Sequence, residues 1–313
     1  MPELSIITPC FNSAPYVGKL IESVCAQTFE DWEHIIVDDG SADCTVATIE
    51  DYLKMDSRLS LIRQHNSGVC HARNRGFEQT SPTSKYVYFL DSDDVLEPEM
   101  LRVLIAHLEE NPHAGLAYCD FTFMDANEEV LPTPPHRRMV PSRWGARWLP
   151  PGCAKTPFVA FYCLNPAPGS MAVIRRSVYE RTSGWDETFG QHNEDVDLFM
   201  RICLIAEVHF VAQKLYRYRQ HPQQSTANRG KFQPQLDKLY RKWDELDLKP
   251  EHRAIVGEAK RFRESVLPWA VGVLAAGEYL NRGRVFRAFR TFLGAIRLWG
   301  FIRLTRARGA LKP

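Results

Sequence analysis

Three clusters of carboxylates are the parts of this sequence best suited to chemistry. The densest, Asp91-Ser92-Asp93-Asp94, follows the five apolar residues 86–90. Carboxylates this close repel one another unless a cation joins them, and hard oxygen ligands suit Mg²⁺ or Mn²⁺ shared with phosphate oxygens. We therefore predict a divalent-metal and diphosphate site at Asp91, Ser92 and Asp93. The alternative interpretation is a solvated turn that caps the next helix.

The second cluster, Asp38-Asp39-Gly40-Ser41, follows the strand-like residues 35–37. A carboxylate at such a strand end can accept hydrogen bonds from a base or a ribose, and Gly40 would let a ligand approach the backbone. Asp39 is therefore a candidate nucleotide-binding residue. Asp39 or Ser41 could instead simply cap the next turn.

The third cluster opens a predicted helix at Glu194 and Asp195, with Val196 and Phe199 on its apolar face. Negative charge is stabilised in the first turn of a helix, and a carboxylate held there beside a substrate hydroxyl could act as a general base. Both acids are candidate catalytic groups. Taken alone, however, the cluster is more typical of ordinary acids at a helix start.

Two further features carry candidate ligand contacts. A glycine-bearing turn, Asn66-Ser67-Gly68, precedes a helix that carries Arg73. Asn66, Gly68 and Arg73 are therefore predicted to contact a diphosphate. His221 follows a strand-like segment and could supply an imidazole to the metal. The alternatives are an exposed, solvated arginine and a structural histidine.

The elements that would position these residues alternate between strands and helices up to about residue 123. Apolar, β-branched runs predict strands, and helical spacing of apolar residues predicts the helices between them. Right-handed crossovers would place the helices on both faces of a mostly parallel sheet, with ligands at the carboxyl ends of its strands. The predicted strands are residues 4–8, 34–37, 59–63, 86–90 and 116–121, and the predicted helices are residues 14–27, 45–54, 69–77 and 98–109.

The second half of the chain is less regular. Residues 125–170 are rich in proline, which predicts long ordered loops of the kind that face a substrate. Regular structure is expected to resume at residues 171–174, followed by a helix from Arg176, a second helix over residues 194–205 and a strand over residues 214–218. The chain after Lys231 is predicted to be helical.

Bulk composition narrows the possible functions. The 313 residues carry 39 basic and 38 acidic side chains, and this balance gives no overall field that would attract nucleic acid. The eight cysteines lack C-x-x-C spacing, which favours a reducing cytosol. Neither a secretory signal nor an apolar run long enough to span a bilayer is visible. We expect a cytoplasmic protein, soluble or peripheral on the inner face of the membrane.

The C-terminal segment, residues 280–313, is strongly basic. No acidic residue follows Glu278, while arginines alternate with aromatic residues at roughly helical spacing. This pattern predicts a helix that lies in an anionic membrane interface. The alternative is a helix that packs its aromatic face on the rest of the protein and leaves its basic face in solvent.

Eight short segments, in order over about residues 3–225, resemble family 2 glycosyltransferases of the GT-A fold. Each match is weak, but eight in the family order are specific. The segments are Ser5-Ile6-Ile7-Thr8-Pro9-Cys10-Phe11-Asn12, Gln27-Thr28-Phe29, Val37-Asp38-Asp39-Gly40-Ser41, Asn66-Ser67-Gly68, Ala72-Arg73-Asn74-Arg75-Gly76, Phe89-Leu90-Asp91-Ser92-Asp93-Asp94, Gly184-Trp185-Asp186 and Glu194-Asp195.

The resemblance implies a GT-A-type catalytic domain over residues 1–225, with a doubly wound α/β sheet. Its nucleotide-sugar half would cover about residues 1–123 and its acceptor half about residues 124–225. Residues 226–313 would form a helical, basic extension. The residues implied to hold the base and ribose are Thr8, Pro9, Phe11, Asn12 and Asp39, with Arg73 near the base or the diphosphate.

The remaining implied roles concern the metal and the reaction. Asp93 would be the direct metal ligand, Asp91 would lie nearer the ribose or a metal-bound water, and His221 would be a further ligand. Asp195 would take the proton from the acceptor hydroxyl in an inverting transfer. The implied donor is a nucleoside-diphosphate sugar, most commonly a UDP-sugar, used with Mn²⁺ or Mg²⁺. The acceptor would be a saccharide or a lipid-linked saccharide in cell-surface polysaccharide or glycolipid assembly.

Two other functions remain open at this stage. A nucleotidyltransferase also uses a doubly wound sheet and acidic metal ligands, but it favours a glycine-rich, basic loop after the first strand, and residues 9–15 contain no Gly, Lys or Arg. A non-catalytic nucleotide-sugar binding or scaffold protein would be expected to have lost carboxylates, whereas Asp91, Asp93 and Asp195 are all present.

Overall fold

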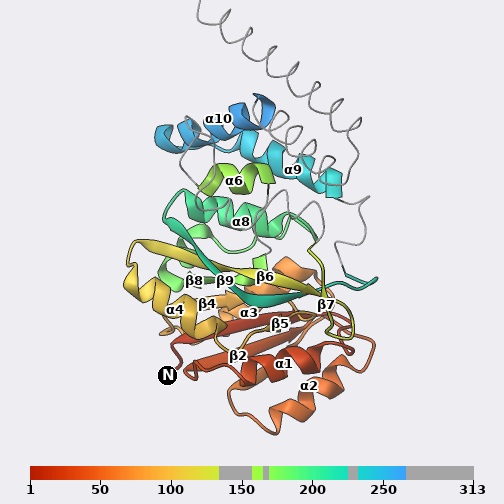
Figure 1. Ribbon diagram of the computed structural model, residues 1–313. Helices are drawn as coiled ribbons and strands as arrows, with labels where there is room; N and C mark the ends of the chain where they lie inside the picture. Colours follow the sequence, from red (N-terminus) through yellow and green to blue (C-terminus); the bar gives the residue numbers. More distant parts are fainter. Residues whose placement is uncertain (134–156, 165–168, 225–231, 266–313) are drawn as a thin grey trace, which may run out of the picture.

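The computed structural model describes residues 1–133, 157–164, 169–224 and 232–265. Its N-terminal half contains four parallel strands in the order β3-β2-β1-β4 (Figure 1). Strands β1, β2 and β4 are almost entirely buried, as expected for parallel strands covered by helices, whereas only Leu59 of the edge strand β3 is buried. The predicted α/β arrangement of this half is confirmed. The strands are β1 (Leu4–Cys10), β2 (Trp32–Asp38), β3 (Leu59–Arg63) and β4 (Tyr86–Phe89).

The sheet continues beyond β4 with mixed directions. The antiparallel strand β8 (Ala172–Arg175) joins β4 to β6 (Ala114–Met124), and β9 (Glu207–Arg219) runs parallel to β6. The short strands β5 (Val95–Leu96) and β7 (Val130–Leu131) pair with β9 and β6. The sheet is therefore parallel in its N-terminal half and mixed in the remainder. Strand β9 is also far longer than the predicted residues 214–218.

Helices fill the connections of the N-terminal half. They are α1 (Val17–Cys25), α2 (Thr45–Leu53), α3 (Val69–Glu78) and α4 (Met100–Glu110). Helix α3 lies close to β1 because Gly76 has no side chain: a Cβ there would come within 2.4 Å of Ile7 Cγ2. This tight packing fixes Arg73, one turn earlier on α3, at the carboxyl end of the sheet.

The helices of the second half of the chain form a stack beyond the sheet. Helices α9 (Phe232–Glu245) and α10 (Pro250–Ser265) lie beyond α6 (Pro157–Leu164) and α8 (Glu194–Cys203), at the end of the molecule away from α1 and α2 (Figure 1). Aromatic rings join these layers, with ring centroids 5.3 Å apart for Phe158 and Trp243 and 5.2 Å apart for Phe161 and Phe199. The short helix α7 (Arg176–Tyr179) follows β8.

Two predictions for the second half need correction. Residues 125–170 were expected to be loops, but within the described residues they include β7 and the helix α6. Pro157, one of the prolines that suggested loops, is the first residue of α6, where the missing backbone N–H costs no intrahelical hydrogen bond. The chain after Lys231 is helical except for the break at residues 246–249, as far as Ser265. The basic segment 280–313 lies outside the described residues.

None of the helices within the described residues is long and apolar enough to cross a membrane.

Candidate active site

The three carboxylates after β4 point to three different partners. Asp91 Oδ1 accepts a hydrogen bond of 2.7 Å from Arg73 Nη2, and Asp93 Oδ2 lies 2.9 Å from His221 Nε2. Asp94 is buried and accepts hydrogen bonds from the Tyr216 hydroxyl at 2.5 Å and from a backbone N–H of β9 at 2.7 Å. Burial raises the pKa of Asp94 well above its ordinary value. The cluster is therefore a built site rather than a solvated turn.

Arg219 ties this turn to the end of β9, and sequence reasoning missed it. Its guanidinium is buried, and its Nε donates to the backbone carbonyl of Asp93 at 2.6 Å. The same side chain reaches the carbonyl of Ala126 at 3.2 Å and Glu128 Oε1 at 3.1 Å. The only sequence signal was its place two residues before His221. Arg219 thereby fixes the backbone that presents Asp93 and His221.

The pair of Asp93 and His221 is suited to a divalent cation. A carboxylate oxygen and an imidazole nitrogen face each other, and the ring of Tyr16 packs on His221 with centroids 4.5 Å apart. No group of three or more metal-ligating side chains occurs among the described residues. Mg²⁺ and Mn²⁺ are commonly held by one or two protein ligands together with substrate phosphates. The residues present fit a cation that is completed by a diphosphate.

Arg73 connects the first acidic cluster to the third. Its side chain is only 5% exposed, so the interpretation of a solvated surface arginine is wrong. Besides Asp91 it contacts Glu194, with Nη1 3.1 Å from Oε1, and its guanidinium carbon lies 4.1 Å from the centroid of the Trp185 ring. Trp185 belongs to the Gly184-Trp185-Asp186 segment, so three separate sequence segments meet on one arginine.

Glu194 and Asp195 begin helix α8, as predicted. Asp195 Oδ2 accepts the Gly169 N–H at 3.1 Å, and its Oδ1 accepts the Val196 N–H at 2.8 Å. A Cβ at Gly169 would come within 2.8 Å of Asp195 Cβ, so glycine lets this backbone approach. Burial raises the pKa of Asp195. The first turn of α8 therefore holds Asp195 through backbone donors and leaves it no cationic side-chain partner among those that the structure describes.

Glu194 is the more strongly perturbed of the two. Its Oε2 is buried without a hydrogen-bond partner in the described part of the chain. Burial raises the pKa of Glu194 to about 7, and the charge of Asp195 adds to this rise while Arg73 opposes it. Perturbed carboxyls of this kind are concentrated at functional sites. Ordinary helix-start acids in solvent would not show this environment, so that interpretation does not hold here.

Asp39 orders the predicted diphosphate turn. Its Oδ1 accepts hydrogen bonds from Gln64 Nε2 at 2.7 Å and the Ser67 N–H at 2.8 Å, and its Oδ2 accepts the Gly68 N–H at 2.9 Å. Asp39 thus holds the turn before α3 rather than capping its own. Gly40 has a φ of +80°, and a Cβ there would come within 2.9 Å of the Asn66 backbone nitrogen. Asn66 itself is exposed.

The residues after β1 divide into buried and exposed members. Thr8 is fully buried and its hydroxyl lies 2.8 Å from His34 Nε2, so this side chain does not face a ligand as expected. Asn12 accepts the Ala42 N–H at 2.9 Å, which joins its loop to that of Asp39. The Phe11 ring is 50% exposed and free to stack on a ligand.

The remaining two predicted residues, Pro9 and Ser92, lie in β1 and in the turn after β4. Pro9 is buried within β1. Ser92 Oγ lies 2.7 Å from Ser13 Oγ, which links the Asp91–Asp94 turn to the loop after β1. The structure therefore gathers Asp91, Asp93, His221, Arg73, Glu194 and Asp195 into one connected cluster, and it places the Asp39 turn beside the same strand ends.

Comparisons with known proteins agree with this arrangement. The model of the family described as Glycosyl transferase family 2 matches residues 5–182. YibD of Escherichia coli K12, described as an uncharacterized glycosyltransferase, is 30% identical over 284 residues, which cover 84% of this chain and 79% of YibD. Some other matches are partial: the chain spans 32% and 28% of the lengths of two curated glycosyltransferases of Bacillus subtilis.

Two solved structures share the fold. The mannosyltransferase PcManGT of Pyrobaculum calidifontis, in complex with GDP-Man and Mn²⁺, has a TM-score of 0.63 at 17% identity and covers 99% of this chain and 84% of its own. Residues 1–349 of TarS from S. aureus, in complex with UDP-GlcNAc, have a TM-score of 0.61 at 18% identity and cover 99% of this chain and 92% of their own. The predicted GT-A-type fold is confirmed.

Proposed function

The chain belongs to glycosyltransferase family 2, and from that premise we propose that it transfers a sugar from a nucleoside diphosphate to an acceptor hydroxyl with inversion. The observation that carries this proposal is the cluster in which Arg73 links Asp91 to Glu194. The carboxylate clusters that carry the proposed metal ligand Asp93 and the proposed base Asp195 thereby lie on either side of one buried cation. Such an arrangement suits a reaction in which negative charge leaves on one side and a proton is removed on the other.

The donor half of the proposal concerns the nucleotide. We assign the base and ribose to Pro9, Phe11, Asn12 and the turn that Asp39 orders, with Thr8 supporting from inside the sheet. Asn66 and Gly68 belong to that turn, and backbone N–H groups at a helix start favour phosphate. A UDP-sugar is the proposed donor, supported by the fold shared with TarS, which was solved with UDP-GlcNAc.

The proposed metal site is Asp93 and His221, with Asp91 and Ser92 beside it. A divalent cation held there would neutralise the charge that develops on the leaving diphosphate. The protein's own contribution is positional: Arg219 fixes the backbone of Asp93, and Asp94 receives the N–H of Arg219. Arg73 holds Asp91 and adds positive charge next to the leaving group.

The proposed base is Asp195. The acceptor oxygen forms a bond to the anomeric carbon, the bond from that carbon to the diphosphate oxygen breaks, and the acceptor proton moves to the Asp195 carboxylate. Because no covalent sugar–enzyme bond forms, one displacement inverts the anomeric centre. The raised pKa of Asp195 makes it a better base than an ordinary aspartate. Glu194 keeps Arg73 in place beside it.

The direct test is donor consumption. The protein is incubated with UDP-, GDP- and dTDP-sugars in Mn²⁺ with a panel of saccharide acceptors, and nucleoside diphosphate release and product anomer are measured. We expect release with one nucleotide class, loss of release with EDTA, and an inverted anomer. Binding of a donor without release under any condition would favour a scaffold protein. Pyrophosphate formation from a nucleoside triphosphate would favour a nucleotidyltransferase.

The metal assignment has its own test. His221→Ala is expected to weaken Mn²⁺ binding in the presence of UDP by roughly tenfold or more, because it removes one of two protein ligands. His71→Ala is the matched control, since His71 is half-exposed and pairs with Glu187 on the surface. Titration of Mn²⁺ followed by electron paramagnetic resonance measures both. Equal affinities of the two variants would contradict the assignment of His221.

The proposed setting is cell-surface polysaccharide or glycolipid assembly at the cytoplasmic face of a membrane, with a saccharide or lipid-linked saccharide as acceptor. Peripheral contact through residues 280–313 would bring the site to a lipid-linked acceptor. The test is co-sedimentation with vesicles that contain anionic lipid. Replacement of Arg284, Arg287 and Arg290 by Gln should release the protein, and unchanged binding would remove this segment from the proposal.

A further inference from the structure

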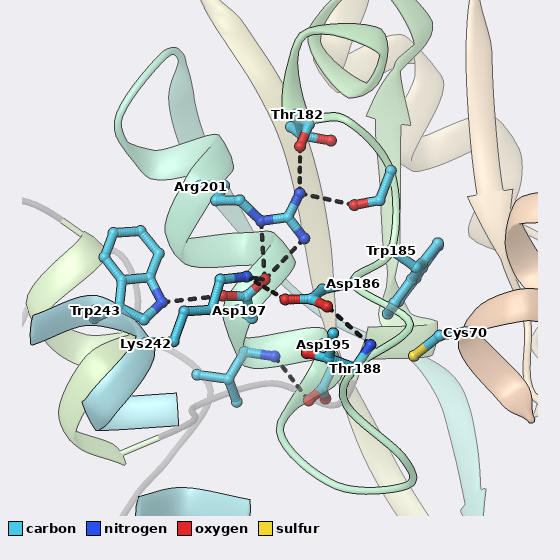
Figure 2. Close-up of polar contacts among 12 residues, drawn as sticks. Cys70, Thr182, Trp185, Asp186, Thr188, Asp195, Asp197, Arg201, Lys242 and Trp243 are labelled. Atoms are coloured by element: carbon cyan, nitrogen blue, oxygen red, sulfur yellow. Dashed lines mark hydrogen bonds and ion pairs between the residues drawn. The ribbon is translucent and has the colours of Figure 1, made fainter. Parts of the chain in front are cut away.

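Helix α8 carries a third acidic residue that faces away from the proposed chemistry. Asp197 is fully buried and lies two residues after Asp195. Its Oδ2 accepts hydrogen bonds from Arg201 Nε at 2.9 Å and from Lys242 Nζ at 2.8 Å, and its Oδ1 accepts the Trp243 indole N–H at 3.0 Å. Two of these three donors belong to α9 (Figure 2). The helix that presents the proposed base is therefore anchored from the C-terminal part of the chain.

Lys242 also reaches a second segment of the site. Its Nζ lies 2.7 Å from Asp186 Oδ2. Burial would raise the pKa of Asp186, but hydrogen bonds from Lys242 and Thr188 outweigh that effect and lower the pKa to about 2. Asp186 directly follows Trp185, whose ring packs on the Arg73 guanidinium. One ammonium group thus joins α8 to the segment that supports Arg73, as Figure 2 shows.

The rest of α9 reinforces this contact. Trp243 is almost fully buried and packs edge-on against Phe158 of α6. One helical turn before Lys242, the ammonium of Lys238 donates to the backbone carbonyl of Thr188. Helix α9 therefore holds both ends of the short 186–188 turn. A surface helix that only covered the core would not need two lysine contacts to one loop.

We propose that Lys242, assisted by Trp243, is a positioning residue of the active site, which makes α9 part of the catalytic unit. This rests on the proposed function, because the groups positioned are the base Asp195 and the Arg73–Glu194 pair. Lys242 touches no substrate atom. It acts by holding the first turn of α8 and the Trp185–Asp186 segment at a fixed separation, so that the base and the arginine keep their relative places.

The expected consequence is a loss of turnover rather than of donor binding. The proposed nucleotide-binding residues lie on the loops after β1, β2, β3 and β4, with which Lys242 makes no hydrogen bond or ion pair among the described residues. Misplacement of a catalytic group by about 1 Å can cost roughly 100-fold in rate. In Lys242→Met we therefore expect kcat to fall roughly 10- to 100-fold while the donor KM stays within about twofold of the wild-type value.

Three variants of the full chain separate positioning from general docking of the helices. Lys242→Arg keeps a cation that can reach two carboxylates and should restore kcat to within about threefold of wild type. Lys260→Met is the matched control, because Lys260 pairs with Asp244 between α10 and α9 and does not touch α8. It should leave kcat unchanged. Trp243→Phe keeps the ring on Phe158 but removes the N–H donor to Asp197, and should lower kcat by a smaller factor.

A second readout does not depend on activity. Amide hydrogen exchange over residues 185–197 should become roughly tenfold faster in Lys242→Met than in wild type or in Lys260→Met, because local opening of this segment costs less. A folded Lys242→Met protein with wild-type kcat and unchanged exchange would overturn the proposal. If the wild type consumes no donor, the proposed function fails, and the exchange comparison alone decides the positioning role. If Lys242→Met does not fold, the same two measurements on Trp243→Phe decide it.

Discussion

The two acidic clusters of the site, Asp91–Asp94 and residues 194–197, differ in the groups that surround their most buried carboxylate. Each places three carboxylates within four residues, and each sends one toward Arg73 and leaves one for chemistry. The third member is fully buried in both. Asp94 accepts hydrogen bonds from a tyrosine hydroxyl and a backbone N–H, whereas Asp197 accepts hydrogen bonds from Lys242, Arg201 and an indole N–H.

The difference lies in how the buried charge is compensated. Among the described residues no cationic side chain donates a hydrogen bond to Asp94, and burial raises its pKa, which favours the neutral form. Asp197 instead lies against two cationic side chains, Lys242 and Arg201. The first solution uses neutral donors within the sheet, and the second uses the charge of Lys242 to fasten α9 to α8. The four predictions below test this contrast.

The largest effect is expected for the one member of each cluster that is left for chemistry. Asp93→Ala and Asp195→Ala should each lower the transfer rate by about 10³-fold or more, since one loses a metal ligand and the other the base. Circular dichroism should show folded proteins. Nucleoside diphosphate release in the presence of acceptor measures the rate, and full turnover by either variant would remove the role assigned to that residue.

The next largest effect is on stability at Asp197. Asp197→Asn leaves the Lys242 and Arg201 cations facing a neutral group in a buried site, which should lower the free energy of unfolding by about 3 kcal/mol. Urea unfolding at pH 7 measures it. Asp51→Asn is the control, because Asp51 forms a surface ion pair with Lys54 and should cost less than about 1 kcal/mol. Similar losses for the two variants would show that the α9 contact is not a buried ion pair.

The third prediction concerns pH and Glu194. Its pKa is about 7 in the folded protein against an ordinary 4.5, so the folded state keeps a proton that the unfolded chain releases. The resulting stability is present below about pH 4.5 and is lost as the pH rises through 7, by on the order of 3 kcal/mol. Glu194→Gln cannot titrate and should show a smaller decline. Urea unfolding at several pH values from 4.5 to 8 tests this, and equal slopes would contradict it.

The smallest effect is expected at Asp94. Because burial already favours its neutral form, Asp94→Asn replaces a protonated carboxyl by a neutral amide of the same shape and should cost about 1 kcal/mol or less at pH 7. The measurement is the same urea series used for Asp197→Asn. A loss as large as that of the α8 variant would show that Asp94 is charged, and the contrast between the two clusters would disappear.

Much of the donor side could be predicted from the sequence because its signals are local. A buried strand followed by Asp91-Ser92-Asp93, or by Asp38-Asp39-Gly40, marks a strand end within a few residues, and parallel strands end at one edge. Periodicity likewise gave β1 to β4 and their helices. The hydrogen bond of the Thr8 side chain could not be predicted in this way, because its partner His34 lies on another strand.

The remaining contacts joined distant segments whose pairing no local pattern encodes. Arg219 reaches Asp93 across 126 residues, and Lys242 reaches Asp197 across 45. Helix α6 was not predicted, because it lies in a stretch where proline suggested loops, although proline is well tolerated in the first turn of a helix. Neither arginine nor lysine carries a sequence signature that separates a buried bridge from a solvated side chain.

The sequence by itself therefore determined the family resemblance, the parallel nucleotide half and the identity of the acidic clusters, because strand ends and helix starts are written in neighbouring residues. Only the tertiary structure decided which carboxylate faces which partner. That choice depends on burial and on cations brought from elsewhere in the chain, which turned Arg73 from a possible surface residue into the link between Asp91 and Glu194, and a C-terminal lysine into the support of the proposed base.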